Sequence, residues 1–471
     1  MVSVKFKIIF VLVLLTALAL RLYRIDRLEV SGDELTSIKI ANGLKQKIDL
    51  EVFSNLQIRE YNNLEGVRKS TINDNGNGFS YNLVLHSWCI VFGSSNTSTR
   101  SVSLIFGMAV LCIVYLFTKY LFKDIRIALL AMFFVSIHPI IVDYAQVSRP
   151  YSLALFLSLL STWILFLMIE RERKTGLSVV YVLLVVLSLL THYLTISVFI
   201  AHFLIVVLLY RDRRILFHYF LSGLAIVILF GIWLINGGLD GKEIMDQQST
   251  MYSQLALNYT EGANSFNIPA TFPNILTGLI QIWLPVFGNY LQLLGFRIRE
   301  ISVLLVIPIS LLLIVFISNY QKLSSNKKFI SLFLIVSIQS LFALIMAINS
   351  GHCISFQTIY TMFVLPYSMG LLAFAAIVLY KTKKAASVFY MLAISIILCI
   401  SLVPLVKGEG RPGCFNNVYM SEANDIKITY KKNDTVYVRS FNDAKFLNIY
   451  LPDDLQIMQK VDTTLTSVYK Y

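Results

Sequence analysis

The chain has 471 residues, of which 56% are hydrophobic and only 14% are charged, and its mean hydropathy is +0.70. A soluble protein of this size has about a quarter of its residues charged, so the composition excludes an ordinary soluble enzyme. The net charge of +13 could indicate a nucleic-acid-binding protein. However, the basic residues form short clusters between long apolar blocks, where they orient membrane helices. We therefore predict a polytopic membrane protein without a nucleic-acid partner.

Eleven apolar blocks have about the length of a membrane span, since a helix needs roughly 17–25 residues to cross a hydrocarbon layer of about 30 Å and flanking residues can extend the shorter blocks. The predicted spans are 8–22, 101–122, 126–142, 151–169, 177–191, 194–209, 215–236, 301–318, 329–349, 361–380 and 385–406. Lys5 and Lys7 precede the first block, which we interpret as an uncleaved signal anchor with the N-terminus inside. The odd number of spans then places the C-terminus outside.

The loop charges agree with this topology, because five consecutive loops on the predicted inner side are basic, as the positive-inside bias requires. They are 119–126, 171–174, 211–214, 322–328 and 381–384. Residues 272–295 are also apolar enough to cross, but a crossing there would turn the last two basic loops outward. We therefore predict that 272–295 is an interfacial or re-entrant segment. The short apolar stretch 82–93 receives the same interpretation.

The predicted fold class is an all-α polytopic membrane protein of about 11 transmembrane helices with a small α/β appendage. The transmembrane domain covers 1–406 and has large outer loops at 23–100 and 237–300. Residues 407–471 are polar, and the alternation in "DTVYVRS" is typical of a strand. Because this segment is short for an independent core, we expect it to rest on the outer loops.

Polar residues that could carry chemistry lie at predicted outer helix ends. Asp33 and Glu34 form an acidic pair soon after the first span, although a solvated loop or the first turn of a helix would also explain an acid there. Arg149 precedes a proline suited to a first helical turn, and a snorkelling cation is the alternative. Tyr151 could equally be an interfacial anchor. His192 lies at a turn between two helices, where a structural role is the alternative.

These positions share one predicted face of the membrane, at the depth of a lipid headgroup. Transfer of a sugar from a lipid phosphate needs a carboxylate that takes the proton of the acceptor hydroxyl. It also needs a cation that holds the phosphate as negative charge grows on it, and arginine offers a bidentate fork for this purpose. Asp33 as the base and Arg149 as the phosphate clamp would meet both needs.

Several stretches of the chain resemble the membrane glycosyltransferases of the GT-C type. They are most similar to the bacterial branch of the protein O-mannosyltransferase family that includes the lipid A aminoarabinose transferases. The stretches are "GDE", "FSYNLVLHSWCIVFGSSNTSTRSVSLIFG", "HPIIVDYAQVSRPYSL", "THY" and "YTMFVLPYSMGLLA". They occur in the family order and cover about 25–380.

The resemblance implies an inverting transfer from a polyprenyl-phosphate-linked sugar at a site that faces the periplasm or exterior. It implies Asp33, with Glu34 beside it, as the catalytic acid/base. It also implies that Arg149, Tyr151 and His192 bind the donor phosphate. The expected location is the bacterial inner membrane.

Two departures from the family pattern leave the donor and acceptor classes open. Ile359-Tyr360 stands where many relatives have Arg-Tyr, and Phe79-Ser80-Tyr81 stands where Pro-Pro is common. The acceptor group could be a hydroxyl or a phosphate, carried by a protein, lipid A, a glycan or another lipid.

The need for a cofactor and the class of function also have alternatives. Some GT-C enzymes use a divalent metal ion, but no cluster of carboxylates or histidines stands out beyond Asp33 and Glu34, so no metal site is predicted. The alternative functions are a polysaccharide polymerase and a lipid-linked glycan transporter or flippase. A transporter would place charges or Gly/Pro breaks near the bilayer centre and would often show repeats, whereas the predicted spans are almost purely apolar in the middle.

Overall fold

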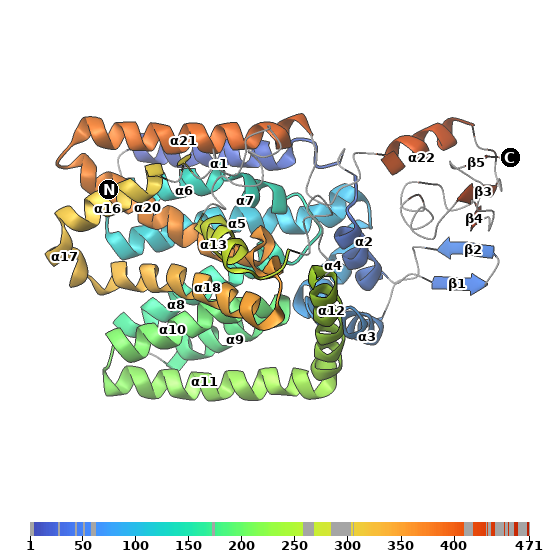
Figure 1. The fold of residues 1–471 in the computed structure, drawn as a ribbon, viewed down its shortest axis with the longest axis horizontal. Coiled ribbons are helices and arrows are strands. Elements are labelled where there is room, and N and C mark those ends of the chain that lie inside the picture. Colours follow the sequence, from blue (N-terminus) through green and yellow to red (C-terminus); the bar gives the residue numbers. More distant parts are fainter. Residues whose placement is uncertain are drawn as a thin grey trace.

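The computed structural model describes residues 4–26, 29–42, 45–49, 52–57, 63–171, 175–257, 268–283, 303–304, 306–408, 418–429, 431, 435–438, 447, 451, 456–459 and 469–470. Helices dominate this part of the chain, and most of the long ones run side by side as a bundle (Figure 1).

The bundle helices in the first half of the chain are α1 (Val4–Leu22), α5 (Asn96–Phe122), α6 (Ile125–Ser136), α8 (Tyr151–Glu170), α9 (Thr175–Thr191), α10 (Ile196–Leu209) and α11 (Arg213–Trp233). Those in the second half are α16 (Val306–Ser318), α18 (Lys327–Ser350), α20 (Leu365–Tyr380) and α21 (Lys384–Lys407). Short helices at their ends are α7 (Pro139–Tyr144), η1 (Tyr193–Thr195), α17 (Tyr320–Ser324), η3 (Cys353–Phe356), α19 (Thr358–Thr361) and η4 (Met362–Val364).

The predicted polytopic helical architecture is confirmed. Helical structure occupies the described residues of the predicted spans, and six helices are long and apolar enough to cross a membrane by length and composition. The number of eleven crossings stays a prediction. One predicted span, 126–142, is divided, because α6 ends at Ser136 and α7 begins at Pro139. The proline ring removes a backbone N–H and so cannot continue the hydrogen-bond ladder of α6.

Shorter elements gather at the right-hand end of the bundle in Figure 1. They are α2 (Gly32–Asn42), α3 (Leu64–Asn73), α4 (Phe79–Phe92), α12 (Leu239–Leu257) and the antiparallel hairpin of β1 (Lys45–Asp49) and β2 (Val52–Gln57). The predicted outer loop 237–300 therefore begins with a helix. α11 passes through a π-helical kink, η2 (Leu234–Gly238), into α12, and Gly237 takes a φ of 125° at this kink.

α13 (Phe272–Trp283) occupies the described part of the segment 272–295. Residues 284–295 lie outside the described residues, so the interfacial or re-entrant interpretation of this segment stays a prediction. α4 covers the stretch 82–93 as a helix of 14 residues, for which the same interpretation also stays a prediction.

The core of the bundle is built around α20, which packs against α5, α6, α16, α18 and α21. Its sequence is apolar on every face, as expected for a helix surrounded by others. Small residues such as Gly370, Ala373 and Ala376 are buried along it. Small side chains let helix backbones approach closely where no water drives their association.

One buried polar network joins four helices inside this bundle. The Thr162 hydroxyl lies 2.9 Å from Nε2 of His202 and 2.7 Å from the Tyr367 hydroxyl. The Tyr181 hydroxyl lies 3.0 Å from Nδ1 of the same histidine. Because both ring nitrogens of His202 have partners, the network serves as a hydrogen-bonded link between α8, α9, α10 and α20.

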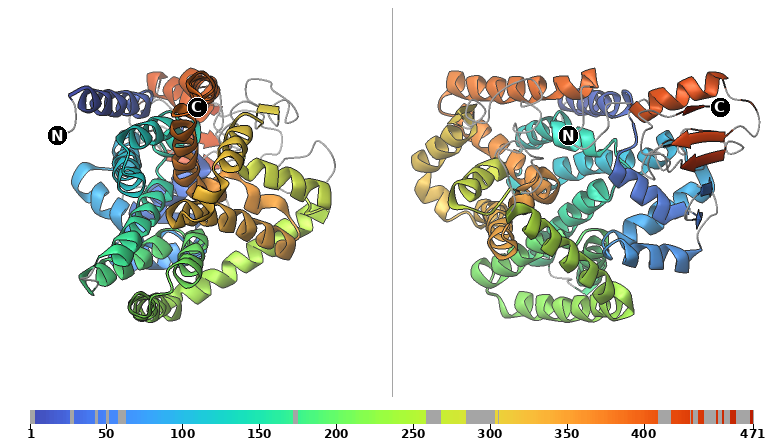
Figure 2. Two further views of the ribbon diagram at one scale, coloured as in Figure 1. Left: turned by 90° about the vertical axis from the view of Figure 1, so that its left-hand side faces the viewer. Right: turned by 45° about the vertical axis from the view of Figure 1, so that its right-hand side comes forward.

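The C-terminal segment contributes α22 (Val418–Thr429) and a three-stranded sheet with the order β4-β3-β5. β3 (Thr435–Val438) pairs in parallel with β4 (Gln456–Gln459) and antiparallel with β5 (Tyr469–Lys470), so the strand predicted in "DTVYVRS" is confirmed. Figures 1 and 2 show these elements at the same end of the bundle as α2 and α3. The domain boundary at 406/407 stays a prediction.

Candidate active site

The candidate site lies at the end of the bundle where α2, α3, α4 and α12 meet (Figure 1). α2 packs on α3 and α4, α4 packs on α5 and α9, and α12 packs on α3. The N-terminus of α2, the turn from α3 to α4, the connection from α7 to α8 and the turn from α9 to α10 therefore come together. Each of these segments supplies one of the side chains described below.

α2 begins with a capping box. The Ser31 N–H donates to Oε2 of Glu34 at 3.1 Å, and the Glu34 N–H lies 3.3 Å from Oγ of Ser31. This reciprocal pair satisfies backbone groups that a helix start leaves open. Successive residues of a helix point about 100° apart, so turning Glu34 inward leaves Asp33 exposed.

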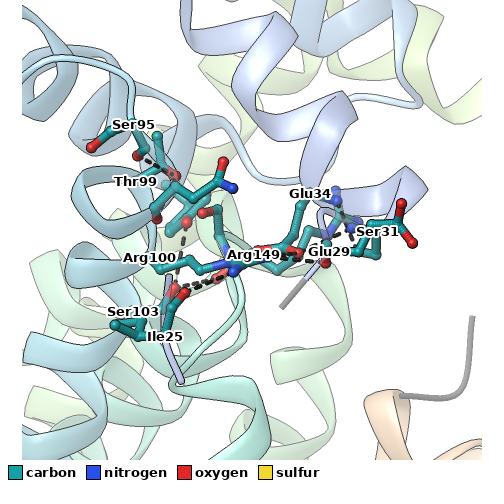
Figure 3. A network of polar contacts seen from close by, with 12 residues as sticks. Ile25, Glu29, Ser31, Glu34, Ser95, Thr99, Arg100, Ser103 and Arg149 are labelled. Carbon is teal, nitrogen blue, oxygen red and sulfur yellow. Dashed lines mark hydrogen bonds and ion pairs between the residues drawn. The ribbon is translucent and has the colours of Figure 1, made fainter. Parts of the chain in front are cut away.

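Glu34 is fully engaged in a buried ion pair (Figure 3). Nε and Nη2 of Arg100 donate to its two oxygens at 2.8 and 3.0 Å, and both side chains are 0% exposed. The Ser148 N–H donates to the same carboxylate at 2.9 Å, while Arg100 also donates to the carbonyls of Ile25 and Glu29. This carboxylate therefore joins α2 to α5 and to the connection before α8, and its oxygens are occupied.

Arg149 reaches the same helix from that connection. Its Nη1 donates to the backbone carbonyl of Asp33 at 3.0 Å and to Oγ of Ser37 at 3.1 Å. Its own carbonyl accepts from the Ser103 hydroxyl at 3.2 Å, and its guanidinium lies 5.9 Å from the centre of the Tyr151 ring. The first turn of α2 and the guanidinium are thus held together by several contacts.

The backbone carbonyl of Asp33 accepts a hydrogen bond from Arg149, whereas the Asp33 side chain stays exposed. In the described part of the chain, the Asp33 carboxylate has no hydrogen-bond partner. The charges of the two residues nevertheless lie close enough to interact. The structure therefore brings the two predicted residues together without closing them into an ion pair.

Tyr151 and His192 pack against each other behind Arg149. Both are 3% exposed, and their ring centres are 5.6 Å apart. Nδ1 of His192 accepts from the Leu194 N–H at 3.3 Å, and its ring also packs against Phe363. Burial and, to a lesser extent, the charge of Arg149 together lower the pKa of His192 to about 3. This imidazole is therefore neutral at physiological pH. It can form a hydrogen bond to a phosphate, but it adds no positive charge.

A second acidic residue, Asp74, joins the site although no motif marks it. It ends α3, where its N–H donates to the carbonyls of Ser70 and Thr71. Burial raises the pKa of the Asp74 carboxyl to about 6; the charge of Arg149 opposes this rise and that of Asp33 adds to it. The only sequence signal is the run of Asn and Gly at 73–78, which is typical of a turn.

The turn that follows Asp74 is held from two sides. Asn75 and Gly76 both have a φ of 73°, a left-handed conformation that asparagine and glycine tolerate. The Tyr193 hydroxyl donates to the Gly76 carbonyl at 2.6 Å, and the Tyr193 N–H donates to Oδ1 of Asn77 at 3.1 Å. From α12, Gly241 packs so closely that a Cβ there would lie 2.6 Å from the Gly76 nitrogen. Both η1 and α12 therefore fix the position of Asp74.

Tyr360 borders the site from α19. Its hydroxyl lies close enough to Tyr151, Asp33 and Arg149 for their charges to interact. It belongs to the Ile359-Tyr360 pair that departs from the family pattern, and the tyrosine of this pair is the member that reaches the site.

The described residues do not fit a resident divalent metal ion. Among them, no group of three or more His, Cys, Asp or Glu side chains could hold one. Asp33 and Asp74 are two carboxylates beside the fixed positive charge of Arg149, which opposes the binding of a second cation there.

Comparison with known proteins gives this arrangement a fold class. Residues 79–235 match the family model described as dolichyl-phosphate-mannose-protein mannosyltransferase. The sequence matches no curated protein. The match extends from α4 to η2 and includes Arg100, Arg149, Tyr151 and His192.

Two solved structures share the fold at low sequence identity. The oligosaccharyltransferase of Archaeoglobus fulgidus in its apo form has a TM-score of 0.53 at 12% identity, covering 96% of this chain and 64% of that one. ArnT of Cupriavidus metallidurans bound to undecaprenyl phosphate has a TM-score of 0.53 at 12% identity, covering 95% of this chain and 85% of that one. The chain thus spans about two thirds of the archaeal protein's length.

These matches confirm the resemblance. The chain has the GT-C fold of these membrane glycosyltransferases, and about a third of it, residues 79–235, matches the mannosyltransferase family model.

Replacing Glu34 by Gln will destabilise the protein, because Arg100 would keep its buried charge without a counter-charge. We expect a loss of about 3–5 kcal/mol, which is typical when one partner of a buried ion pair is removed. The neighbouring Asp33→Asn variant is the matched control and should change stability by less than about 0.5 kcal/mol. Denaturation in detergent compares the two, and equal stabilities would contradict the structural role of Glu34.

The raised pKa of Asp74 predicts a pH dependence of stability. Its pKa rises from 3.8 to about 6 on folding, so the folded state binds the proton more tightly than the unfolded state. The stabilisation is complete below about pH 4 and is lost as pH rises through 6. Melting temperatures measured between pH 4 and 7 should fall with rising pH in the wild type relative to Asp74→Asn. Parallel curves for the two proteins would refute the assignment.

Proposed function

We propose that the protein is a glycosyltransferase that moves a sugar from a polyprenyl-phosphate-linked donor to an acceptor hydroxyl at the outer face of the membrane. The observation that supports this most directly is the docking of Arg149 on the first turn of α2, which leaves the Asp33 carboxylate exposed beside it. The GT-C fold and the family match also support transfer from a lipid-linked donor, since the related ArnT structure holds undecaprenyl phosphate.

Arg149 is suited to hold the donor phosphate. Its Nη1 is fixed by α2, and its buried Nε–H has no hydrogen-bond partner among the described residues. The N–H groups that the protein leaves open can bind phosphate oxygens as a fork. Because α2 orients the guanidinium beforehand, little reorganisation is needed as negative charge develops on the leaving phosphate.

In the proposed reaction, Asp33 takes the proton of the acceptor hydroxyl. The acceptor oxygen forms a bond to the anomeric carbon on the face opposite the phosphate. The bond between that carbon and the phosphate oxygen breaks, and its electron pair leaves with the polyprenyl phosphate. The products are the glycosylated acceptor with inverted configuration, free polyprenyl phosphate beside Arg149, and protonated Asp33, which returns its proton to water.

The other predicted site residues take supporting roles in this proposal. Glu34 positions Asp33, because its ion pair with Arg100 sets the rotation of α2. Tyr151 and His192 form the wall behind Arg149, where the neutral imidazole can bind a phosphate oxygen through a hydrogen bond.

The basic end of the bundle supports an outer-face site, and the membrane in this proposal is the bacterial inner membrane. The ion pair of Lys328 with Glu170 at 2.6 Å joins the end of α8 to the start of α18. The ammonium groups of Lys123 and Lys328 lie 4.4 and 5.4 Å from the centre of the Tyr120 ring. Clusters of this kind favour the cytoplasmic side, and the candidate site belongs to the opposite helix ends.

Asp33→Asn is expected to lower the rate of transfer by about 10²- to 10⁴-fold, the usual contribution of a positioned base. The measurement is the release of undecaprenyl phosphate from a panel of undecaprenyl-phosphate-linked hexoses by purified protein. Asp26→Asn is the matched control, because Asp26 is an exposed acid of the same segment and should leave the rate unchanged. Full activity of Asp33→Asn would exclude this residue as the base.

Arg149→Lys is expected to weaken binding of undecaprenyl phosphate by about tenfold, because an ammonium cannot act as a bidentate fork. Native mass spectrometry or thermophoresis with undecaprenyl phosphate measures the affinity. Arg126→Lys is the control and should bind undecaprenyl phosphate normally. Arg126 is exposed and pairs with Asp124 at the basic end of the bundle. Unchanged affinity in Arg149→Lys would remove the phosphate clamp from the mechanism.

A further inference from the structure

α12 connects the candidate site to the end of α18. α12 begins against the turn that carries Asp74, through the contact of Gly241 with Gly76. Near its other end, the Ser253 hydroxyl donates to the Ser350 carbonyl at 2.6 Å, at the end of α18. α12 therefore extends from the turn that carries Asp74 to the end of α18.

The turn after α18 is also paired with the segment before α13. His352 forms an antiparallel bridge with Pro269, the Ala270 N–H donates to the Gly351 carbonyl at 3.0 Å, and the Cys353 N–H donates to the Ile268 carbonyl at 2.9 Å. His352 is thereby fixed by its backbone on one side and by α12 on the other.

Aromatic side chains connect this turn to the catalytic residues. The Tyr360 hydroxyl lies within interaction range of Asp33 and Arg149 at one end and of Tyr252 on α12 at the other. The Tyr252 ring packs edge-on against His352, with 6.1 Å between ring centres. Tyr252 and His352 are therefore in ring contact, and Tyr360 lies near both this pair and the candidate site.

The imidazole of His352 is buried but incompletely bonded. Its exposed fraction is 6%, its Nδ1 lies 3.4 Å from the Ser350 hydroxyl, and its Nε2 has no hydrogen-bond partner among the residues that the structure describes. Burial lowers the pKa of His352, so the ring is neutral at physiological pH. An unpartnered buried nitrogen is unfavourable, and a ligand hydroxyl would satisfy it.

We propose that Tyr360, Tyr252 and His352 form the acceptor subsite of the proposed transferase and that the acceptor is a carbohydrate. This proposal rests on the proposed function. A sugar ring presents an apolar C–H face, which matches the faces of tyrosine rings, and hydroxyl edges, which match a neutral imidazole. A buried polar group that only the correct ligand can pair also gives strong selectivity.

The test uses methyl α-mannoside and methyl β-glucoside as probes, with binding followed by saturation-transfer difference NMR on the purified full chain. The wild type is expected to bind at least one glycoside in the millimolar range. His352→Ala should weaken that binding by about tenfold or more, while His352→Gln, which keeps a hydrogen-bonding group, should lose less than about threefold. Affinity for undecaprenyl phosphate should be the same in all three proteins.

His218→Ala, at a histidine near the start of α11, is the matched control and should bind glycosides as the wild type does. The proposal is overturned if the wild type binds neither glycoside, if His352→Ala binds them normally, or if a Ser/Thr-rich peptide binds instead in a His352-dependent manner. Because the glycoside experiment needs no donor turnover, a failure of the proposed function at Arg149 would be seen separately, in the undecaprenyl phosphate measurements.

Discussion

The positions of the proposed base, Asp33, and of the carbonyl that anchors Arg149 depend on the buried ion pair of Glu34 with Arg100. Both side chains are 0% exposed, and the same guanidinium holds the carbonyls of Ile25 and Glu29, so it fixes the chain that enters α2. Replacing a buried pair with apolar residues is often neutral or stabilising, so stability alone is a weak reason for it. We interpret it as a device that sets the rotation of α2 against α5, and with it the directions of Asp33 and of the carbonyl that binds Arg149.

The bilayer explains why the ion pair of Glu34 with Arg100 lies at one end of the bundle. Between the helix ends, polar groups must find partners within the protein, as Thr162, His202 and Tyr367 do in their closed network. Groups with open hydrogen-bonding capacity, such as Arg149 and Asp33, lie instead on connections and first turns. A lipid phosphate and a polar acceptor can meet there, because the phosphate stays at headgroup depth while its apolar chain remains in the membrane.

The long helices were predictable because twenty or so apolar residues leave few alternatives to a membrane helix. The break between α6 and α7 lies within one apolar run, and its signal in the sequence is Pro139. Within the candidate site, the sequence predicted Arg149 and the acidic pair but could not divide the pair's roles. Asp33 and Glu34 are neighbours in sequence, and only the packing of α5 shows which one turns inward. Asp74 was missed because its place depends on Tyr193 and Gly241, contacts that no local pattern encodes.

The way Arg149 contacts α2 matters for the chemistry proposed at Asp33. A guanidinium paired directly with the Asp33 carboxylate would stabilise its charged form and lower its proton affinity, and both groups would then be less available to substrate. Here the guanidinium binds the Asp33 carbonyl and Ser37, so the cation is fixed while the carboxylate keeps its oxygens open. Because a single helical turn supplies both the anchor and the base, the distance from the proposed phosphate site to the proposed base is set by backbone geometry, which thermal motion of long side chains disturbs little.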